Sequence, residues 1–88
     1  MKSGKDLERY FKGAANHRRI DILRLVSLIP HITVEGMAEK LDCDFQVIAV
    51  HAQKLSRFGL LDKKYIGRAV GHTISPCGKK FLTFMQTL

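Results

Sequence analysis

The segment from Thr33 to Leu60 places the strongest constraint on the fold, because two short amphipathic patterns meet there at a tight polar turn. In the first pattern, four apolar residues recur at helical spacing: Val34, Met37, Ala38 and Leu41. Thr33 and Asp44 are residue types suited to the N-caps of the two helices, and the second pattern ends at Gly59. Two helices joined by a turn as short as Leu41-Asp42-Cys43-Asp44 predict a helix-turn-helix.

The second pattern, over about 45–58, has two chemically different faces. At 100° per residue, Ile48, Ala52 and Leu55 fall on one face and are expected to point into the core. The opposite face combines amides, small apolar groups and cations: Gln46, Val47, Val50, Gln53, Lys54 and Arg57. No acidic residue occurs between Phe45 and Arg57. We interpret this segment as a recognition helix that enters the major groove of DNA, and an ordinary solvent-exposed helix is the alternative.

The positive charge is concentrated in the second half of the chain. The formal net charge is +7 and the sequence pI is about 9.8. Residues 1–44 carry a net charge of +1, whereas residues 45–88 carry +6 and contain a single acid, Asp62. Because the excess begins where the proposed recognition helix begins, it favours a nucleic-acid partner over a merely solvated charged face.

A basic hairpin is predicted directly after Gly59. Residues 60–66 are expected to form a strand, residues 67–71 a turn and residues 72–75 a second strand. A hairpin in this position is a wing, and Lys63, Lys64 and Arg68 are expected to reach phosphates or, for Arg68 at the tip, the minor groove. A solvated hairpin with ordinary surface lysines is the alternative.

Two helices are predicted before the helix-turn-helix. The first, over residues 5–15, carries one apolar stripe: Leu7, Tyr10, Phe11 and Ala14. Asn16 is an N-cap candidate for a second helix over 17–28, which Pro30 ends. The apolar ridge of this second helix is expected to be Ile22, Leu23, Val26 and Ile29. Residues 31–33 are a candidate for a short additional strand.

A last helix is predicted from about Pro76. It carries more apolar side chains than a solvated surface helix does: Phe81, Leu82, Phe84, Met85 and Leu88. It therefore requires a partner, which is the first helix of the same chain, the same pair of helices in a second chain, or both. Eighty-eight residues make one small domain of marginal size, for which help from a partner subunit is expected.

Together these patterns predict an α+β fold, mainly α, of the winged helix-turn-helix type. It has about five helices and a two-to-three-stranded β-wing, and residues 1–88 form a single DNA-binding domain.

With these residues in place, the chain resembles winged-helix transcriptional regulators of the ArsR (arsenic-repressor) type, with MarR-type regulators as near relatives. The resemblance covers about residues 10–82 and depends on order and spacing. The matching residues are Ala15-Asn16, Arg19, Ile22-Leu23, Thr33-Val34, Ala38, Leu41, Ile48, His51, Leu55, Gly59-Leu60, Gly67-Arg68, His72, Ile74-Ser75-Pro76 and Gly78. The resemblance implies a homodimer built from the first and last helices, which binds a two-fold related operator with half-sites about 34 Å apart. The expected interface residues are Leu7, Tyr10, Phe11, Phe81, Phe84, Met85 and Leu88.

Three features depart from this resemblance. Gly36 stands in the first turn of its helix, where it is expected to weaken the helix by about 1 kcal/mol relative to Ala. The recognition helix carries Val47, Ala49 and Val50 where Ser, Thr and Arg are usual, which weakens the expectation of strong base-specific readout. Metal-sensing members place ligands in segments that lack them here, since residues 37–41 contain no Cys and residues 76–88 contain no His, Asp or Glu. No metal and no cofactor are therefore expected.

Base contacts are expected from the middle of the recognition helix. Gln46 and Gln53 can each pair with an adenine edge, and Val47 and Val50 can contact a thymine methyl group, so a preference for A/T-containing sites is predicted. An exposed Val50 can serve a protein contact instead. Lys54 and Arg57, together with the wing cations, are expected to contact phosphates.

The two cysteines are expected to differ in role. Cys43 in the turn is expected to point inward as a buried structural thiol, whereas Cys77, near a helix N-terminus and two lysines, is a candidate redox residue. Two cysteines without a disulfide framework, and no membrane-spanning or leader segment, predict a reducing, cytoplasmic location without membrane association. His51 is expected to pack between helices and His72 to lie in the strand beside the wing.

These observations favour a sequence-specific regulator that binds double-stranded DNA as a homodimer. The recognition helix at about 45–58 is expected in the major groove and the wing at about 60–75 on the backbone or in the minor groove. The alternatives are a winged-helix module that binds protein or RNA, and a nonspecific architectural DNA-binding protein. An enzyme is not expected, because the sequence contains no phosphate-binding glycine loop, no nucleophile with an identifiable base and no paired carboxylates in a pocket-forming context.

Overall fold

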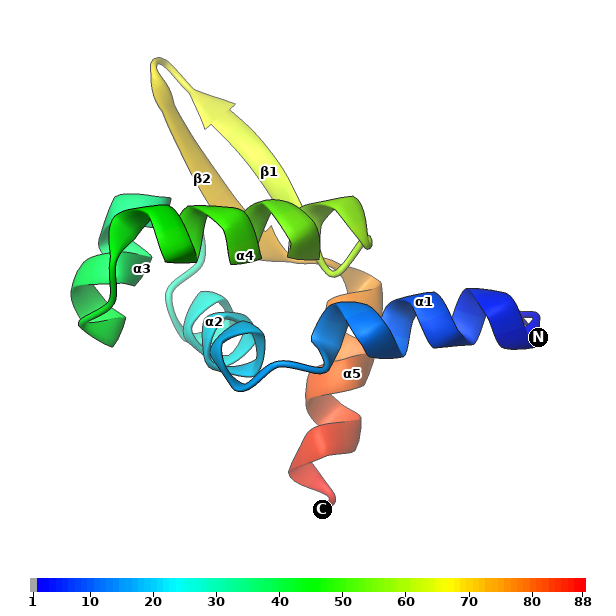
Figure 1. Cartoon of the computed structure of the whole chain (residues 1–88). Coiled ribbons are helices and arrows are strands. Elements are labelled where there is room, and N and C mark those ends of the chain that lie inside the picture. Colours follow the sequence, from blue (N-terminus) through cyan, green and yellow to red (C-terminus); the bar gives the residue numbers. More distant parts are fainter. Residues whose placement is uncertain (1) are drawn as a thin grey trace.

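The computed structural model describes residues 2–88 and contains, in that range, five helices and one antiparallel hairpin (Figure 1). In chain order the elements are α1 (Gly4–Ala14), α2 (His17–Leu28), α3 (Val34–Leu41), α4 (Phe45–Arg57), β1 (Leu61–Ile66), β2 (Ala69–Ile74) and α5 (Pro76–Gln86). This confirms the predicted α+β fold, mainly α, with a wing; Met1 of the predicted domain lies outside the described residues. Among residues 2–88, no helix has the length and apolar character needed to cross a membrane.

Side chains at the predicted caps begin three of the helices. Asn16, Thr33 and Asp44 each accept backbone N–H groups from the first turn of α2, α3 and α4, at 2.8 to 3.2 Å. These bonds satisfy amide protons that no helical carbonyl reaches, so they fix where each helix begins. The three capping predictions are confirmed. Ser75 caps α5 in the same way, because its Oγ accepts the Gly78 N–H at 2.9 Å.

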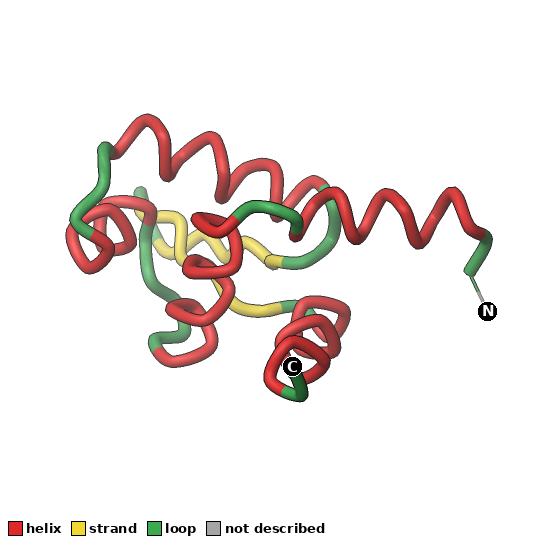
Figure 2. Tube along the Cα trace, turned by 60° about the horizontal axis from the view of Figure 1, so that its bottom comes forward, coloured by secondary structure: helices red, strands yellow, loops and turns green. Residues whose placement is uncertain are grey.

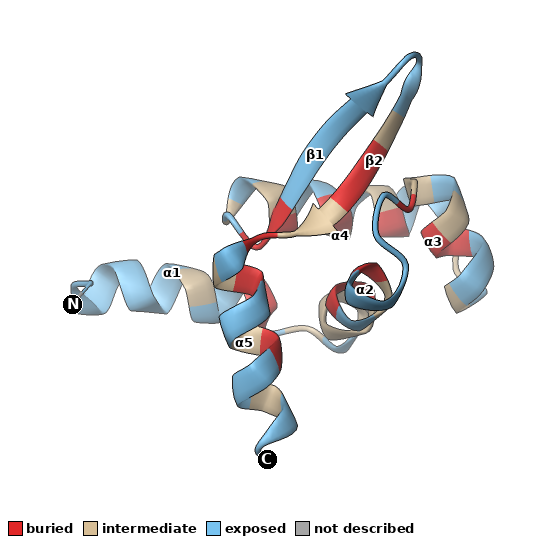
Figure 3. Cartoon of the chain, turned by 180° about the vertical axis from the view of Figure 1, so that it is seen from behind, coloured by how far each residue is buried: buried red, intermediate tan, exposed pale blue. Residues whose placement is uncertain are grey.

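The core lies where α2, α3 and α4 pack together beneath the base of the hairpin. In Figure 3, the buried stretches of these helices face the centre of the molecule. Ile22, Leu23 and Ile48 have no exposed surface, in agreement with the predicted inward faces of α2 and α4. The prediction that Ile29 completes the ridge of α2 is wrong. Ile29 is the C-cap residue of α2 and is 38% exposed, because the helix ends at Leu28.

The wing has longer strands and a shorter turn than predicted. β1 pairs with β2 in antiparallel register from Leu61–Ile74 to Ile66–Ala69, so the turn is only Gly67-Arg68. The predicted turn over 67–71 is therefore wrong for residues 69–71, and the predicted strand ends at 60 and 75 are each one residue too long. Gly71 is not a turn residue. A Cβ there would lie 2.9 Å from the carbonyl oxygen of His31, so glycine permits a close approach of two backbones.

The segment before α3 adds one bridge to the wing instead of a third strand. The His31 N–H donates to the His72 carbonyl at 2.8 Å, and the His72 N–H donates to the Ile32 carbonyl at 3.0 Å. His31 has a φ of 69°, which interrupts the extended backbone that longer pairing needs. Within the described residues the wing therefore has two strands, at the lower end of the predicted two to three.

The first and last helices touch within one chain. α1 begins at Gly4, one residue before the predicted start, and projects beyond the rest of the body in both Figure 1 and Figure 2. The Phe11 ring meets the Phe81 ring of α5 edge-on, with centroids 5.1 Å apart, and Tyr10 lies 6.3 Å from the same ring. α1 of the same chain thus covers part of the apolar surface of α5, and the remainder still requires a partner.

Candidate nucleic-acid interface

The outer face of α4 consists of the six residues predicted to face away from the core. Ile48, Ala52 and Leu55 are at most 1% exposed, which fixes the orientation of the helix. All six residues of the outer face are exposed: Gln46, Val47, Val50, Gln53, Lys54 and Arg57. The predicted division of α4 into two faces is confirmed, and no acidic side chain belongs to the outer face.

The turn between α3 and α4 holds this face in place. Asp42 adopts a left-handed conformation, with φ 52° and ψ 51°, and ends α3. The Cys43 N–H then donates to the Ala38 carbonyl at 3.0 Å. The Asp44 carboxylate accepts the first free amides of α4, so its negative charge lies at the positive end of the helix dipole.

The wing presents its basic residues on different sides. Lys63 and Tyr65 line a surface hollow between the wing and α4, opposite Ala49 and Gln53. Because successive strand residues point to opposite faces, Lys64 lies on the other face of the hairpin. Among the predicted wing contacts, Lys63 is thus beside α4, Arg68 is at the turn, and Lys64 faces away. Tyr65, which is 72% exposed, was not predicted, although its spacing of two from Lys63 could have indicated it.

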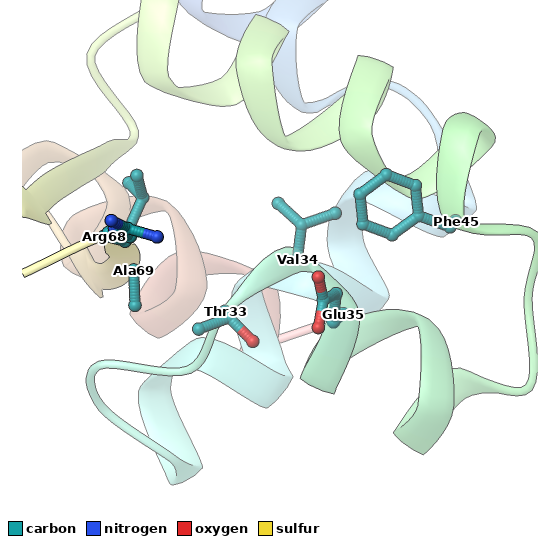
Figure 4. A pocket seen from close by; sticks show the side chains of 7 residues that line it. Thr33, Val34, Glu35, Phe45, Arg68 and Ala69 are labelled. Atoms are coloured by element: carbon teal, nitrogen blue, oxygen red, sulfur yellow. The ribbon is translucent and has the colours of Figure 1, made fainter.

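A second hollow lies between the tip of the wing and the first turns of α3 and α4 (Figure 4). Arg68 and Ala69 form its wing side, and Val34, Glu35 and Phe45 form the other side. Glu35 is the one acidic residue that lines it. A carboxylate therefore stands beside the surface on which the basic residues of the wing and α4 are exposed.

His72 supports the base of the wing from inside. It is 2% exposed, and its Nδ1 lies 3.3 Å from the Ile32 carbonyl oxygen, so Nδ1 carries the proton of this contact. Burial lowers the pKa of His72, the bond to Ile32 opposes that change, and the nearby Lys63 charge adds to the lowering. The imidazole is therefore neutral at pH 7. The prediction that His72 lies in the strand beside the wing is confirmed.

Arg19 joins α1, α2 and α4. Its Nη1 donates to the Lys12 and Gly13 carbonyls at 3.4 and 3.1 Å, and its Nε donates to His51 Nδ1 at 3.2 Å. Because Nδ1 accepts, the proton of the neutral ring is on Nε2. Burial lowers the pKa of His51, and four neighbouring basic side chains lower it further: Arg19, Lys54, His17 and Arg18. His51 packs between helices as predicted, but its link to Arg19 was not predicted, because a helical projection does not show which residue of another helix lies opposite.

The predicted dimer residues form an α1–α5 surface. Its inner members Tyr10, Phe81 and Met85 are partly buried against the core of their own chain. Its outer members are exposed, by 38% for Leu7, 53% for Phe11, 52% for Phe84 and 90% for Leu88. The structure therefore brings Tyr10 and Phe11 of α1 against Phe81 of α5 and leaves four of the seven predicted residues exposed in the single chain.

Both cysteines are free and partly buried. The Cys43 Sγ donates to the Leu41 carbonyl at 3.1 Å, and its burial is less complete than predicted, because the turn lies at the surface. Cys77 packs against the edge of the core, and its redox role stays a prediction. Among residues 2–88, no three His, Cys, Asp or Glu side chains are grouped closely enough to hold a metal ion.

The chain matches no protein-family model, and no curated protein is recognisably similar to it. Solved structures nevertheless share its fold. HlyU from Vibrio cholerae superposes with a TM-score of 0.84 at 21% identity, covering 99% of this chain and 96% of its own. The homodimeric winged helix-turn-helix DNA-binding domain of a possible ArsR-family transcriptional regulator from Mycobacterium bovis gives 0.85 at 21% identity, covering 99% and 86%. A MarR family transcription regulator gives 0.79 at 20% identity, covering 91% and 55%.

These similarities show that the chain has the winged helix-turn-helix fold. They confirm, at the level of the fold, the resemblance to ArsR-type and MarR-type regulators.

Proposed function

We propose that this chain is a transcriptional regulator that binds double-stranded DNA in a sequence-specific manner as a homodimer. In this proposal α4 enters the major groove, and the wing contacts the backbone or, through Arg68, the minor groove. The observation that carries the proposal is the outer face of α4, whose six residues are all exposed and comprise amides, small apolar groups and cations but no acid. A face of this composition matches both parts of DNA, since cations suit the phosphates and amides suit the base edges.

The proposed base contacts lie in the middle of that face. Gln46 and Gln53 have the donor and acceptor needed to pair with an adenine edge, and Val47 and Val50 offer methyl groups to thymine. Both valines are about half exposed, at 47% and 49%. The proposed site therefore prefers A·T pairs, with Lys54, Arg57, Lys63 and Arg68 as phosphate contacts and Lys64, on the other face of the hairpin, as a weaker one.

The proposed dimer uses the α1–α5 surface. Four of its side chains are exposed in the single chain, and a two-fold axis would place like apolar groups against one another. One structural neighbour is itself described as homodimeric, which supports this assignment. A dimer would present two copies of α4 to half-sites about 34 Å apart.

Selection of bound duplexes from a random pool tests the proposal. We expect enrichment of a two-fold related motif that contains A·T pairs in each half-site. As a control, the double variant Gln46→Ala and Gln53→Ala should lose the sequence preference and keep salt-dependent binding, because its phosphate contacts are intact. Enrichment of G·C-rich sequences would refute the proposed base contacts.

A second candidate function is a module that binds protein or RNA. The observation that favours it is the apolar part of the α4 surface, where Phe45, Val47 and Val50 are each about half exposed. A lack of duplex binding at low salt would select this function. Steeply salt-dependent binding without any enriched sequence would instead select a nonspecific architectural DNA-binding protein.

The remaining parts of the proposal concern the whole chain. We infer that residues 1–88 act as one DNA-binding domain in the cytoplasm, associated with the chromosome, without enzymatic activity, cofactor or metal. The structural neighbours described as transcriptional regulators support the absence of catalysis. For Cys77 as a redox residue, mass spectrometry after peroxide treatment is the test, with Cys43 as the internal reference; an unmodified Cys77 would end that idea.

A further inference from the structure

The two edges of the outer face of α4 have different neighbours. On one edge, Gln53 and the adjoining Ala49 line the hollow opposite Lys63 of the wing. On the other edge, Lys54 lies beside His51 at 100° per residue, and His51 accepts a hydrogen bond from Arg19 of α2 at 3.2 Å. α4 therefore lies between the wing and the N-terminal end of α2, as Figure 1 shows with the hairpin above α4 and α2 below it.

The α2 side of α4 carries a cluster of cationic and imidazole groups. We call it the α2 cluster, and its members are His17, Arg18, Arg19, His51 and Lys54. Arg19 is hydrogen-bonded to the His51 ring, Lys54 follows His51 by three residues in α4, and His17 and Arg18 precede Arg19 at the start of α2. These four basic side chains all lower the pKa of His51, and no acidic residue is among the causes of the shift. The first turn of α2 also lacks an acid.

No carboxylate of the described residues forms an ion pair with this cluster, although Asp44 lines a surface hollow together with His51. Within residues 2–88, the ion pair closer than 4 Å is Glu8 with Lys12 in α1, so neither Asp21 nor Asp44 is paired with the cluster. Asp44 uses its carboxylate to cap α4. Arg19 donates its hydrogen bonds to neutral acceptors only. Like charges held together without counterions repel one another, and a surface of this kind attracts a polyanion.

The geometry of the major groove gives this cluster a role. The groove is about 12 Å wide and accepts one α-helix, so a helix that lies in it has a phosphate backbone on each side. When α4 occupies the groove, the wing faces one backbone. The α2 cluster, on the opposite edge of α4, faces the other.

We propose that Arg18, His51 and Lys54 contact the phosphate backbone on the side of the major groove opposite the wing. This inference rests on the proposed insertion of α4 into DNA. Arg18 and Lys54 supply positive charge, and His51 supplies a neutral N–H donor at Nε2, because Arg19 occupies its Nδ1. The domain then holds both backbones of the groove, with the wing on one and the α2 cluster on the other.

The charge contacts are tested by the salt dependence of binding to a mixed-sequence duplex of about 30 base pairs, long enough for two half-sites. Arg18→Gln and Lys54→Gln should each reduce the slope of log affinity against log salt by about 0.9, because one phosphate contact is lost. Arg24→Gln is the matched control: it removes the same charge from the exposed outer side of the same helix and should leave the slope unchanged.

The donor role of His51 is tested by two substitutions at one position. Gln keeps an acceptor for Arg19 and an N–H donor for a phosphate, so His51→Gln should bind within about twofold of the wild type. Leu keeps neither, so His51→Leu should bind about tenfold more weakly. Thermal unfolding of both variants identifies any loss of folding. Equal losses of affinity in two folded variants would overturn the donor role.

The outcomes separate this inference from the proposed function. If Arg18→Gln and Lys54→Gln keep the wild-type slope while Arg68→Ala lowers it, DNA is bound without the α2 cluster. The inference and the proposed Lys54 contact are then wrong, while the insertion of α4 into the major groove and the wing contacts of the proposed function stand. If the wild-type protein binds no duplex at low salt, the proposed function fails and the inference fails with it. Lower slopes in both α2-cluster variants, with Arg24→Gln unchanged, support both.

Discussion

Two surfaces of this molecule leave large apolar side chains in solvent, and they differ in what surrounds those side chains. On the outer face of α4, Val47 and Val50 are 47% and 49% exposed and lie among amides and cations. On the α1–α5 surface, Phe11 and Phe84 are 53% and 52% exposed; Phe11 lies edge-on against Phe81, and Phe84 follows Phe81 by about one turn of α5. The exposed fractions are nearly the same. The kind of partner is therefore indicated by the neighbouring charge and not by the degree of exposure.

The two surfaces suit partners of opposite character. An apolar surface that carries the same groups on every copy can pair with itself across a two-fold axis. A surface with cations and no acid repels its own copy and attracts phosphates. The comparison predicts that a carboxylate introduced on each surface will abolish a different interaction.

The largest effect is expected from Phe84→Glu on the α1–α5 surface. A carboxylate in the proposed apolar interface has no partner there, so the protein should become monomeric while the fold persists. Duplex affinity should fall at least a hundredfold, because one α4 reads one half-site only. Analytical ultracentrifugation and a binding titration measure the two effects.

Thr83→Glu is the matched control, since Thr83 is exposed on the side of α5 away from Phe81 and Phe84. It adds the same charge to the same helix and should leave the dimer intact. A Phe84→Glu protein that stays dimeric would show that the α1–α5 surface is not the interface.

A smaller effect is expected from Val50→Glu on the outer face of α4. The carboxylate would face the phosphates, so duplex affinity should fall by about tenfold to a hundredfold. The dimer should persist, which is the reverse of the first result. Val50→Gln is the control, because glutamine has the size of glutamate but no charge. This variant should lose much less affinity. If Val50→Glu instead weakens the dimer, the two surfaces are not independent.

Within the wing, the unequal positions of two neighbouring lysines give a finer test. Lys63 lines the hollow beside α4, and Lys64 lies on the other face of the hairpin. Lys63→Ala and Arg68→Ala should each lower the salt slope by about 0.9 and weaken binding to all sequences several-fold. Lys64→Ala should change the slope less. Equal salt slopes for Lys63→Ala and Lys64→Ala would mean that the DNA phosphate backbone contacts both faces of the wing.

The features that sequence predicts here are those determined by local interactions. The caps at Asn16, Thr33 and Asp44 each depend on amides two or three residues away. The division of α4 into two faces follows from helical periodicity alone. Such features can be predicted because every group involved lies within one or two turns of the chain.

The features that sequence misses are those determined by contacts between distant segments. Gly71 looks like a turn residue in sequence, but its role depends on His31, forty residues earlier, whose backbone passes against it. The bond between Arg19 and His51 likewise joins residues 32 positions apart. The α2 cluster therefore could not be found by counting charge along the chain, which assigns Arg18 and Arg19 to the nearly neutral half.

The smallest effect is expected from Glu35, the carboxylate beside the tip of the wing. If DNA lies against this hollow, Glu35 opposes its phosphates across screened solvent, and Glu35→Gln should raise duplex affinity about twofold to threefold. Glu39→Gln, with the same charge change on the same helix and outside the hollow, is the control and should have less effect. A lower affinity for Glu35→Gln would contradict this expectation, because it would mean that the carboxylate accepts a hydrogen bond from DNA, as from a cytosine amino group. The first turn of α3 would then take part in base recognition, and the rule that acids are excluded from the DNA-facing surface would hold for α4 alone.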